Sequence, residues 1–236
     1  MMELASGIKG AFELIIGLDR EVVEISLRSL WVSSLSCLLS ALIALPLAFF
    51  SFFFSFPGRR FLIGLCETLY ALPTVLVGLL LLVLLSRSGP FGGLGLLFTP
   101  WAMVLGQVLF VSPLILGLSY SVLSAQGKSP YFTALSLGAG RFEAMWVVFR
   151  EAKGSFLSVL LMGLGRALSE VGCAIMVGGN IRGHTRVLTT ALALEAGKGD
   201  FAMAFALGLV LLFFSASIIL ATKVLGRSDR KWVENW

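Results

Sequence analysis

Charged residues are scarce in this sequence, and long stretches of it contain none. Asp, Glu, Lys and Arg make up 13% of the 236 residues, whereas hydrophobic residues make up 58%. Soluble domains contain about a quarter charged residues. A soluble helical protein would also need polar faces on its helices, but the segment LVGLLLLVLL at 76–85 is apolar on every face. The composition therefore predicts an all-α polytopic membrane protein.

Histidine and cysteine are also rare, which leaves few side chains for metal or redox chemistry. His184 is the single histidine and cannot form a metal site alone, and the three cysteines lie in apolar stretches without metal or redox spacing: Cys37, Cys66 and Cys173. We interpret these cysteines as packing residues. An intramembrane hydrolase would need a nucleophile with a base, or a metal cluster, inside the spans. We predict no catalytic residue and no metal site.

The net charge of +5 is modest, and the basic residues cluster between the apolar stretches. This distribution fits membrane orientation better than nucleic-acid binding, so no nucleic-acid partner is expected. Five spans are predicted, at about 22–56, 61–86, 98–125, 155–177 and 201–225. The first is longer than a bilayer requires. Pro73 is expected to bend the second.

The segment 1–21 is acidic, and its short apolar run is interrupted by Glu13. No cleavable signal is evident. Ile8, Phe12, Ile15 and Ile16 share one helical face. This pattern fits a short helix at the membrane surface, and a partly ordered terminus remains an alternative.

The loop 127–153 separates two apolar regions but is itself rich in large apolar side chains. They recur at helical spacing on both sides of a small-residue run, Gly138-Ala139-Gly140. Two short amphipathic helices joined at a break are therefore predicted. Side chains of this kind need a surface to cover them, which favours a docking element; a helix lying on lipid is the alternative.

This loop resembles the coupling loop of ABC-importer permeases, in which Glu-Ala-Ala is followed after three residues by Gly. Here Phe132-Thr133-Ala134 and Gly138 occupy those places, and only Ala134 and the glycine match strictly. The sequence TALSLGAGRFEAMWVVF has the family's Leu-Gly-Ala-x-Arg arrangement followed by an aromatic-rich helix, with Arg141 and Phe142 at its start. The resemblance implies the type I importer architecture, in which this loop is cytoplasmic and contacts an ATPase.

The fourth span, GLGRALSEVGCAIMVGGNIRG, resembles the corresponding segment of molybdate, tungstate and sulfate permeases. The matching positions are Arg166, Ser169-Glu170, Gly172 and Gly179-Asn180-Ile181. Together with LPTVLVGLLLL and RVLTTALALEAGKGDFA, this segment most resembles tungstate permeases. The resemblance covers nearly the whole chain from Leu27 onward.

Arg166 and Glu170 stand four residues apart, which places them on one helical face where they can pair. An isolated charge in a span is costly, so a pair or a wet cavity is expected. Together with Ser169, they either line or gate a translocation path or brace the bundle as a structural ion pair, and both interpretations stay open. Glu67 is likewise expected to face protein or water.

The loop after the fourth span contains Asn180, Arg182, His184 and Arg186. These side chains are candidates for anion reception or for contact with an outer partner. An ordinary solvated loop is the alternative.

The resemblance implies the permease subunit of an ATP-driven importer of tungstate or molybdate, working as a homodimer in a prokaryotic inner membrane. An extracytoplasmic oxyanion-binding protein would deliver the anion. A cytoplasmic ABC ATPase dimer would carry ATP and Mg²⁺, because this chain has no GxxxxGK[ST] sequence and is expected to bind no cofactor itself.

Two alternatives remain. One is a permease for sulfate, phosphate or another small solute, and the other is an ion-driven secondary transporter that uses Glu67, Arg166 and Glu170 as a charge relay.

The expected domains are an extracytoplasmic or interfacial segment (1–21), a membrane domain (22–225) and a cytoplasmic tail (226–236). If the loop 127–153 is cytoplasmic, ten Lys and Arg lie inside and seven outside, which favours an outer N-terminus and a cytoplasmic C-terminus.

Overall fold

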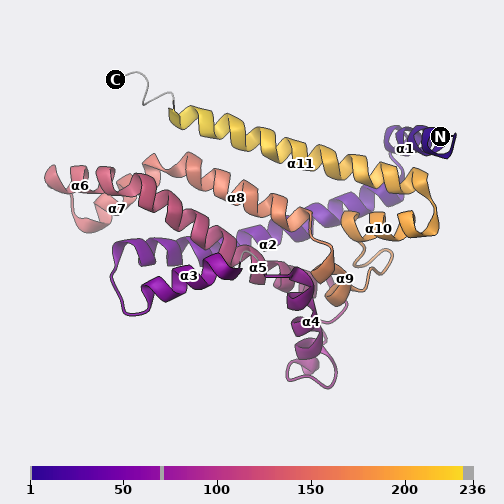
Figure 1. The fold of residues 1–236 in the computed structure, drawn as a ribbon, viewed down its shortest axis with the longest axis horizontal. Coiled ribbons are helices and arrows are strands. Elements are labelled where there is room, and N and C mark those ends of the chain that lie inside the picture. Colours follow the sequence, from indigo (N-terminus) through magenta and orange to yellow (C-terminus); the bar gives the residue numbers. More distant parts are fainter. Residues whose placement is uncertain (1, 70–71, 231–236) are drawn as a thin grey trace.

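The computed structural model describes residues 2–69 and 72–230, and every regular element in these ranges is helical (Figure 1). The elements are α1 (Met2–Ile16), α2 (Arg20–Phe53), α3 (Arg59–Leu69), α4 (Thr74–Leu85), the 3-10 turn η1 (Gly92–Leu94), α5 (Pro100–Val122), the π-helical turn η2 (Leu123–Gly127), α6 (Lys128–Ser136), α7 (Arg141–Glu151), α8 (Lys153–Leu168), α9 (Gly172–Gly178), α10 (Leu188–Lys198) and α11 (Phe201–Arg230).

Three helical runs are long and apolar enough to cross a membrane: Arg20–Phe53, Pro100–Ser136 and Phe201–Val224. Two further pairs of helices, α3 with α4 and α8 with α9, pass the same test together, although each is bent by more than 40°. Counting each bent pair as one crossing gives five, which agrees with the all-α polytopic fold predicted from composition.

The helix α2 begins at Asp19, whose carboxylate accepts the backbone N–H groups of Glu21 and Val22. Buried serines then follow one face of α2, and those at 26, 29 and 36 donate their hydroxyls to the carbonyls four residues earlier. Small residues of this kind let helices approach closely. This face packs against α5, and the two helices form the centre of the bundle.

The second predicted span, 61–86, is two helices whose axes meet at 102°. Pro73 is the N-cap of α4, and the described part of α3 extends to Leu69. Proline has no N–H to continue a helix, and at the start of a new one that missing donor costs nothing. Residues 70–71 lie outside the described ranges, so the expected bend is confirmed only as a break between α3 and α4.

The helix α1 packs across the start of α11 (Figure 1). A Cβ at Gly10 would lie 2.9 Å from the Cβ of Ala202, and Ala11 is fully buried. The side chains of Ile8, Phe12 and Ile16 are exposed on α1. The segment 1–21 therefore contains a helix, and its placement at the membrane surface stays a prediction.

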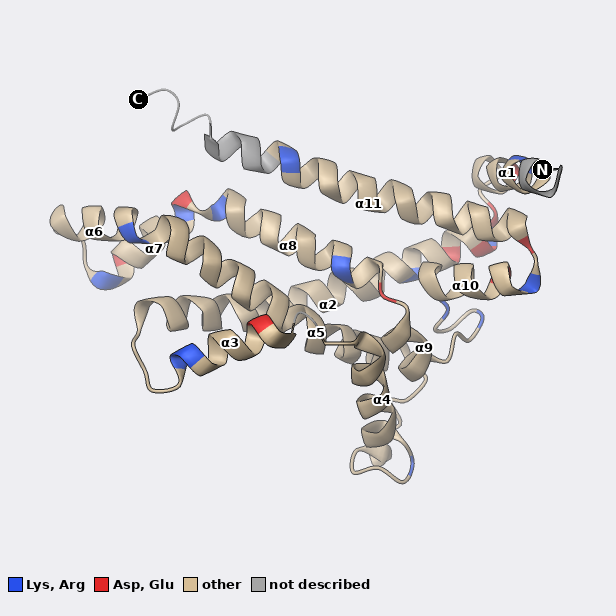
Figure 2. Cartoon of the chain, viewed as in Figure 1, with Lys and Arg blue, Asp and Glu red and all other residues tan. Residues whose placement is uncertain are grey.

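The two ends of the bundle are formed by different elements. The helices α6 and α7, the turn between α2 and α3, and the C-terminal end of α11 lie at one end, whereas α1 and α10 lie at the other (Figure 1). Many charged residues lie towards these ends, although some lie on α3 and where α8 meets α9, and the middles of α2, α5 and α11 carry none (Figure 2). This arrangement fits an odd number of crossings. The predicted tail 226–236 falls partly on residues 231–236, which lie outside the described ranges.

Candidate functional site

The loop between α5 and α8 forms two short helices, α6 and α7, as the sequence predicts. They are joined at residues 137–140, where Gly138 has φ +90°. Only glycine adopts this conformation without strain, which explains the break at this residue. The helix α7 then begins after Gly140, whose N–H donates to the Glu143 carboxylate at 2.8 Å.

One face of α6 and α7 is held against the bundle. The ring centroid of Tyr131 lies 4.9 Å from that of Phe53, and the ring centroid of Phe149 lies 6.0 Å from that of Phe49 and 5.8 Å from that of Phe156. Aromatic pairs at these centroid distances are attractive beyond their area burial. The loop is therefore fixed to the ends of α2 and α8.

Other large side chains of α6 and α7 are exposed, and among them Trp146 stacks on Phe149 with ring centroids 5.3 Å apart. Phe142 is 80% exposed and Phe132 is 61% exposed, and Trp146 and Leu137 are exposed beside them. Of the six residues predicted to couple to an ATPase, Phe132, Thr133, Gly138, Arg141 and Phe142 are exposed, whereas Ala134 is buried. Large apolar side chains in this number mark an interaction surface.

A second group of predicted residues lies where α8 ends and α9 begins. The Arg166 Nη1 is 3.1 Å from the Glu170 Oε2, so the predicted ion pair is present. The predicted fourth span, 155–177, is bent within its length, because α8 ends at Leu168 and α9 leaves at 59°. The Glu170 Oε1 accepts the N–H of Cys173 at 2.9 Å, and Glu170 therefore caps a free N–H in the first turn of α9, beside the N-cap residue Val171, while pairing with Arg166.

Buried polar side chains from other helices form hydrogen bonds to the backbone at the break between α8 and α9. The Gln107 amide donates to the Ala167 carbonyl at 3.1 Å, and the Thr189 hydroxyl donates to the Glu170 carbonyl at 2.6 Å. Sequence reasoning placed Gln107 inside the third span without assigning it a role, and it missed Thr189. Ser169 is exposed and donates to the carbonyls of Gly165 and Arg166, so it faces back onto α8.

The two members of the ion pair differ in exposure. The Glu170 side chain is 2% exposed and the Arg166 side chain is 38% exposed, with the guanidinium 4.9 Å from the centre of the Phe110 ring. A buried carboxylate is thus neutralised by a cation that reaches the surface of the single chain. Glu67 is exposed on α3, and no ion pair links it to Arg166 within the described ranges.

The loop between α9 and α10 is fastened to the start of α2. The Arg182 Nε donates to the Glu21 carboxylate at 2.9 Å, and Arg28 donates to the carbonyls of Gly183 and Arg186. The hydrogen bond to Glu21, together with its charge, raises the pKa of Arg182 above its ordinary value. Arg182 therefore has a structural partner in this chain.

Arg186 and Glu195 form the buried centre of the same network. Arg186 Nη1 lies 3.3 Å from Glu21 and 3.5 Å from Glu195, and Glu195 also pairs with Lys198. Asn180 has φ +51° and donates to the Thr190 carbonyl at 3.2 Å, which fixes the loop to α10. His184 is exposed. Sequence reasoning missed the roles of Glu21 and Glu195.

The three cysteines are buried and form no disulfide bond, in keeping with packing roles. Among residues 2–69 and 72–230, no three His, Cys, Asp or Glu side chains come together as a metal site would require.

The chain is similar in sequence to several known transport proteins. Residues 38–231 match the family described as the binding-protein-dependent transport system inner membrane component. A tungstate uptake system permease from Peptoclostridium acidaminophilum is 40% identical, with 92% of this chain and 96% of that protein aligned. A permease of the same description from Campylobacter jejuni is 36% identical, with 94% and 93% aligned. A sulfate permease from Synechocystis is 26% identical, with 76% and 65% aligned.

Proposed function

This chain belongs to the family of inner-membrane components of binding-protein-dependent transport systems, and on that premise we propose that it is the permease of a tungstate or molybdate importer. Membership of the family makes the chain a membrane permease component that works with an ATPase and a binding protein. The identity of the anion, the dimer and the residue roles are our proposals.

The observation that carries the choice of anion is the full-length similarity to the tungstate permease of Peptoclostridium acidaminophilum, at 40% identity. The Synechocystis sulfate permease is 26% identical over a shorter part of the chain. The first alignment includes α8, α9 and the loop that follows. Tungstate and molybdate are tetrahedral dianions of similar size, so we assign both to the same path.

We assign the ATPase contact to the exposed face of α6 and α7, centred on Phe132, Gly138 and Phe142. This face combines an apolar surface with a glycine-enabled turn and is fixed to α2 and α8 by aromatic contacts. Movement of the ATPase is thereby passed to the helices of the bundle. Ala134 is buried, and we assign it to the packing of α6.

We assign the translocation path to the surface around Arg166, Ser169 and Glu170. The half-exposed Arg166 guanidinium would be costly against lipid, and a second copy of the chain facing it would enclose it in a wet interface. This supports a homodimer with the path between subunits. A path of this kind requires the anion to leave as readily as it enters. Glu67, exposed on α3, is kept as a secondary candidate for this path.

We place the end that holds α6 and α7 in the cytoplasm and the N-terminus outside. The excess of Lys and Arg at the α6–α7 end supports this orientation. The loop with Asn180 and Arg182 then faces the binding protein, whose docking would act on the ion-pair network that holds the loop to α2.

The test of substrate is competitive uptake by the complete transporter in proteoliposomes. Radiolabelled tungstate uptake should be reduced strongly by unlabelled molybdate and weakly by sulfate at equal concentration. Equal competition by sulfate would assign the chain to a broader class of oxyanion permease, and no tungstate uptake would overturn the proposal.

A further inference from the structure

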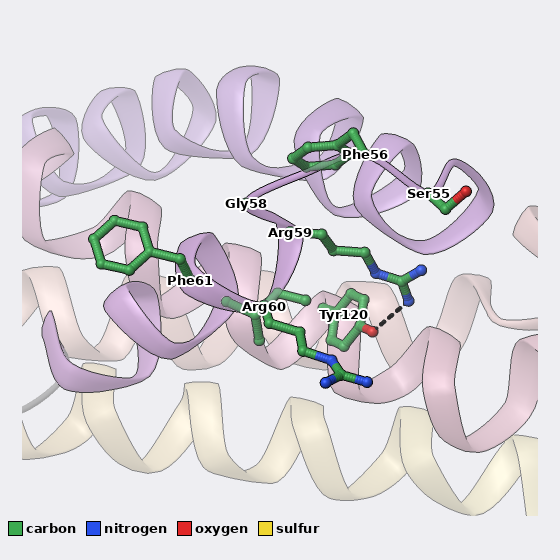
Figure 3. Close-up of a pocket in the computed structure, with 8 residues that line it drawn as sticks. Ser55, Phe56, Gly58, Arg59, Arg60, Phe61 and Tyr120 are labelled. Carbon is green, nitrogen blue, oxygen red and sulfur yellow. Dashed lines mark hydrogen bonds between the residues drawn. The ribbon is translucent and has the colours of Figure 1, made fainter.

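A cavity of about 600 Å³ lies at the turn between α2 and α3, apart from the site described above. Its polar lining comes from Arg59, Arg60, Ser55 and Tyr120, and Phe56 and Phe61 contribute apolar surface. Figure 3 shows the Arg59 and Arg60 side chains extending towards Tyr120, with Phe61 on the far side of the turn. Two adjacent arginine side chains in one cavity favour the binding of an anion.

Arg59 is held in place by Tyr120. Its Nη2 donates to the Tyr120 hydroxyl at 2.6 Å, and its guanidinium carbon lies 5.5 Å from the centre of the Tyr120 ring (Figure 3). A guanidinium has five N–H donors. The single bond to Tyr120 therefore orients Arg59 and leaves donors available for a ligand.

Arg60 and the first turn of α3 supply further donors. Arg60 is exposed and forms no hydrogen bond or ion pair with the residues that the structure describes. The N–H groups of Arg59 and Leu62 donate to Phe56 and Gly58, whereas those of Arg60 and Phe61 have no backbone acceptor in the described ranges. The positive end of α3 thus adds to the field of both arginines.

The surroundings of the cavity are those of a membrane interface. Phe54, Phe61 and Leu65 are exposed around the turn, and α2 ends at Phe53 directly before it. The turn lies at the same end of the bundle as α6 and α7 (Figure 1). Exposed phenyl rings beside paired guanidinium groups match a molecule that has a phosphate group and acyl chains.

We propose that this cavity binds the phosphate of an anionic membrane lipid, with Arg59, Arg60 and Tyr120 contacting the headgroup and Phe61 contacting the acyl chains. The shared chemistry is a phosphate oxyanion, and the apolar rim assigns it to a lipid over a free ion. A bound lipid would fasten the α2–α3 turn to the cytoplasmic leaflet. The proposal is independent of which anion the transporter imports.

The test uses the assembled transporter in mild detergent, with bound molecules counted by native mass spectrometry. The probes are phosphatidylglycerol, phosphatidylcholine with the same acyl chains, and inorganic phosphate. Arg60→Gln should weaken phosphatidylglycerol binding about fivefold, the effect of one arginine near a charged lipid surface. Arg60→Lys should retain most of the binding, and Tyr120→Phe should weaken it because Arg59 loses its partner.

Arg87→Gln is the matched control, because Arg87 is also an exposed arginine but lies in the linker between α4 and α5. It should leave phosphatidylglycerol binding unchanged. Equal losses in Arg60→Gln and Arg87→Gln would overturn the proposal, as would equal retention of the two lipids. Binding of inorganic phosphate without a preference for phosphatidylglycerol would assign the cavity to a free oxyanion and refute the lipid.

Discussion

Glu170 serves two helices with one side chain. One carboxylate oxygen accepts the N–H of Cys173 at the start of α9, and the other pairs with Arg166 at the end of α8. Glu170→Gln keeps an acceptor for the cap and loses the ion pair, whereas Glu170→Ala loses both. We expect Glu170→Ala to be the less stable variant by about 1 kcal/mol, the usual net contribution of one hydrogen bond.

Thermal unfolding of the purified permease measures this difference between the two Glu170 variants. The double variant Arg166→Glu with Glu170→Arg restores the pair but not the cap, since arginine has no acceptor. We expect it to transport better than either single charge reversal while staying less stable than the parent. Absence of any rescue would leave the pair without support as a working unit.

The sequence predicted the Arg166–Glu170 pair but not the break between them. Spacing by four indicates a shared helical face. That argument does not reveal that the helix ends between the two residues, or that the Glu170 carboxylate accepts an N–H of the next helix. The partners Gln107 and Thr189 come from α5 and α10. Contacts between distant segments of this kind have no periodic signal.

Arg186 and Arg182 share a partner but differ in burial, which gives a second prediction at this scale. The Arg186 side chain is 10% exposed, and Arg182 is 74% exposed. Arg186→Gln should destabilise the fold by about 3 kcal/mol, because it leaves Glu21 and the buried Glu195 with less compensation. Arg182→Gln should destabilise the fold much less, because solvent screens the exposed pair between Arg182 and Glu21. Chemical unfolding of the purified chain measures both, and equal effects would contradict the network.

At the scale of the elements, Gly138 decides how α6 turns into α7. Its φ of +90° disfavours any residue with a Cβ, although a Cβ there would meet no atom within 4 Å. Gly138→Val should therefore cost about 1–2 kcal/mol through the backbone alone. We expect reduced transport with ATP hydrolysis retained, measured as the ratio of anion taken up to ATP hydrolysed.

Gly199→Val is the control for Gly138→Val. Gly199 has φ +84° and equally open surroundings, but it ends α10 at the other end of the bundle. Similar strain there should leave the transport-to-ATP ratio unchanged. Normal coupling in Gly138→Val, or equal uncoupling in both variants, would contradict the role given to α6 and α7.

Phe142 gives a further prediction for the same element. It is exposed at the start of α7, so Phe142→Ser should leave unfolding of the isolated permease unchanged. The ATPase should bind the variant at least tenfold more weakly, as expected for a truncated aromatic anchor. Phe91→Ser is the control, because Phe91 is an exposed phenylalanine outside this loop. Unaltered ATPase affinity in Phe142→Ser would show that α7 is not the contact.

The elements that sequence predicted well are those with a strong local signal. Small residues around Gly138 and the apolar periodicity after Arg141 located α6, the break and α7. The bend in the span 61–86 was expected from Pro73, whereas the break in the span 155–177 was not predicted. Each is apolar enough to read as one helix, and each is two helices in the folded chain. Hydropathy measures length and composition, and it does not register a bend.

For the whole molecule, the opposite placement of α1 and the end of α11 agrees with an odd number of crossings (Figure 1). Composition alone was enough to predict the fold class. The packing of α1 on α11 was not predicted, because Gly7, Gly10 and Ala11 are too small to form an apolar pattern. Gly7 and Gly10 matter because they allow close contact with Phe201 and Ala202.

The charge-relay alternative and the ATP-driven account differ in what powers uptake. The described residues do not join Glu67 to Arg166 and Glu170 by ion pairs, and the family to which the chain belongs works with a binding protein. These observations favour ATP as the energy source.

Tungstate uptake into proteoliposomes is the measurement that tests the energy source most directly. The permease is reconstituted alone or together with its ATPase and binding protein. We predict accumulation only when both partners and ATP are present, irrespective of any proton or sodium gradient. Accumulation by the permease alone, driven by an ion gradient, would contradict the account.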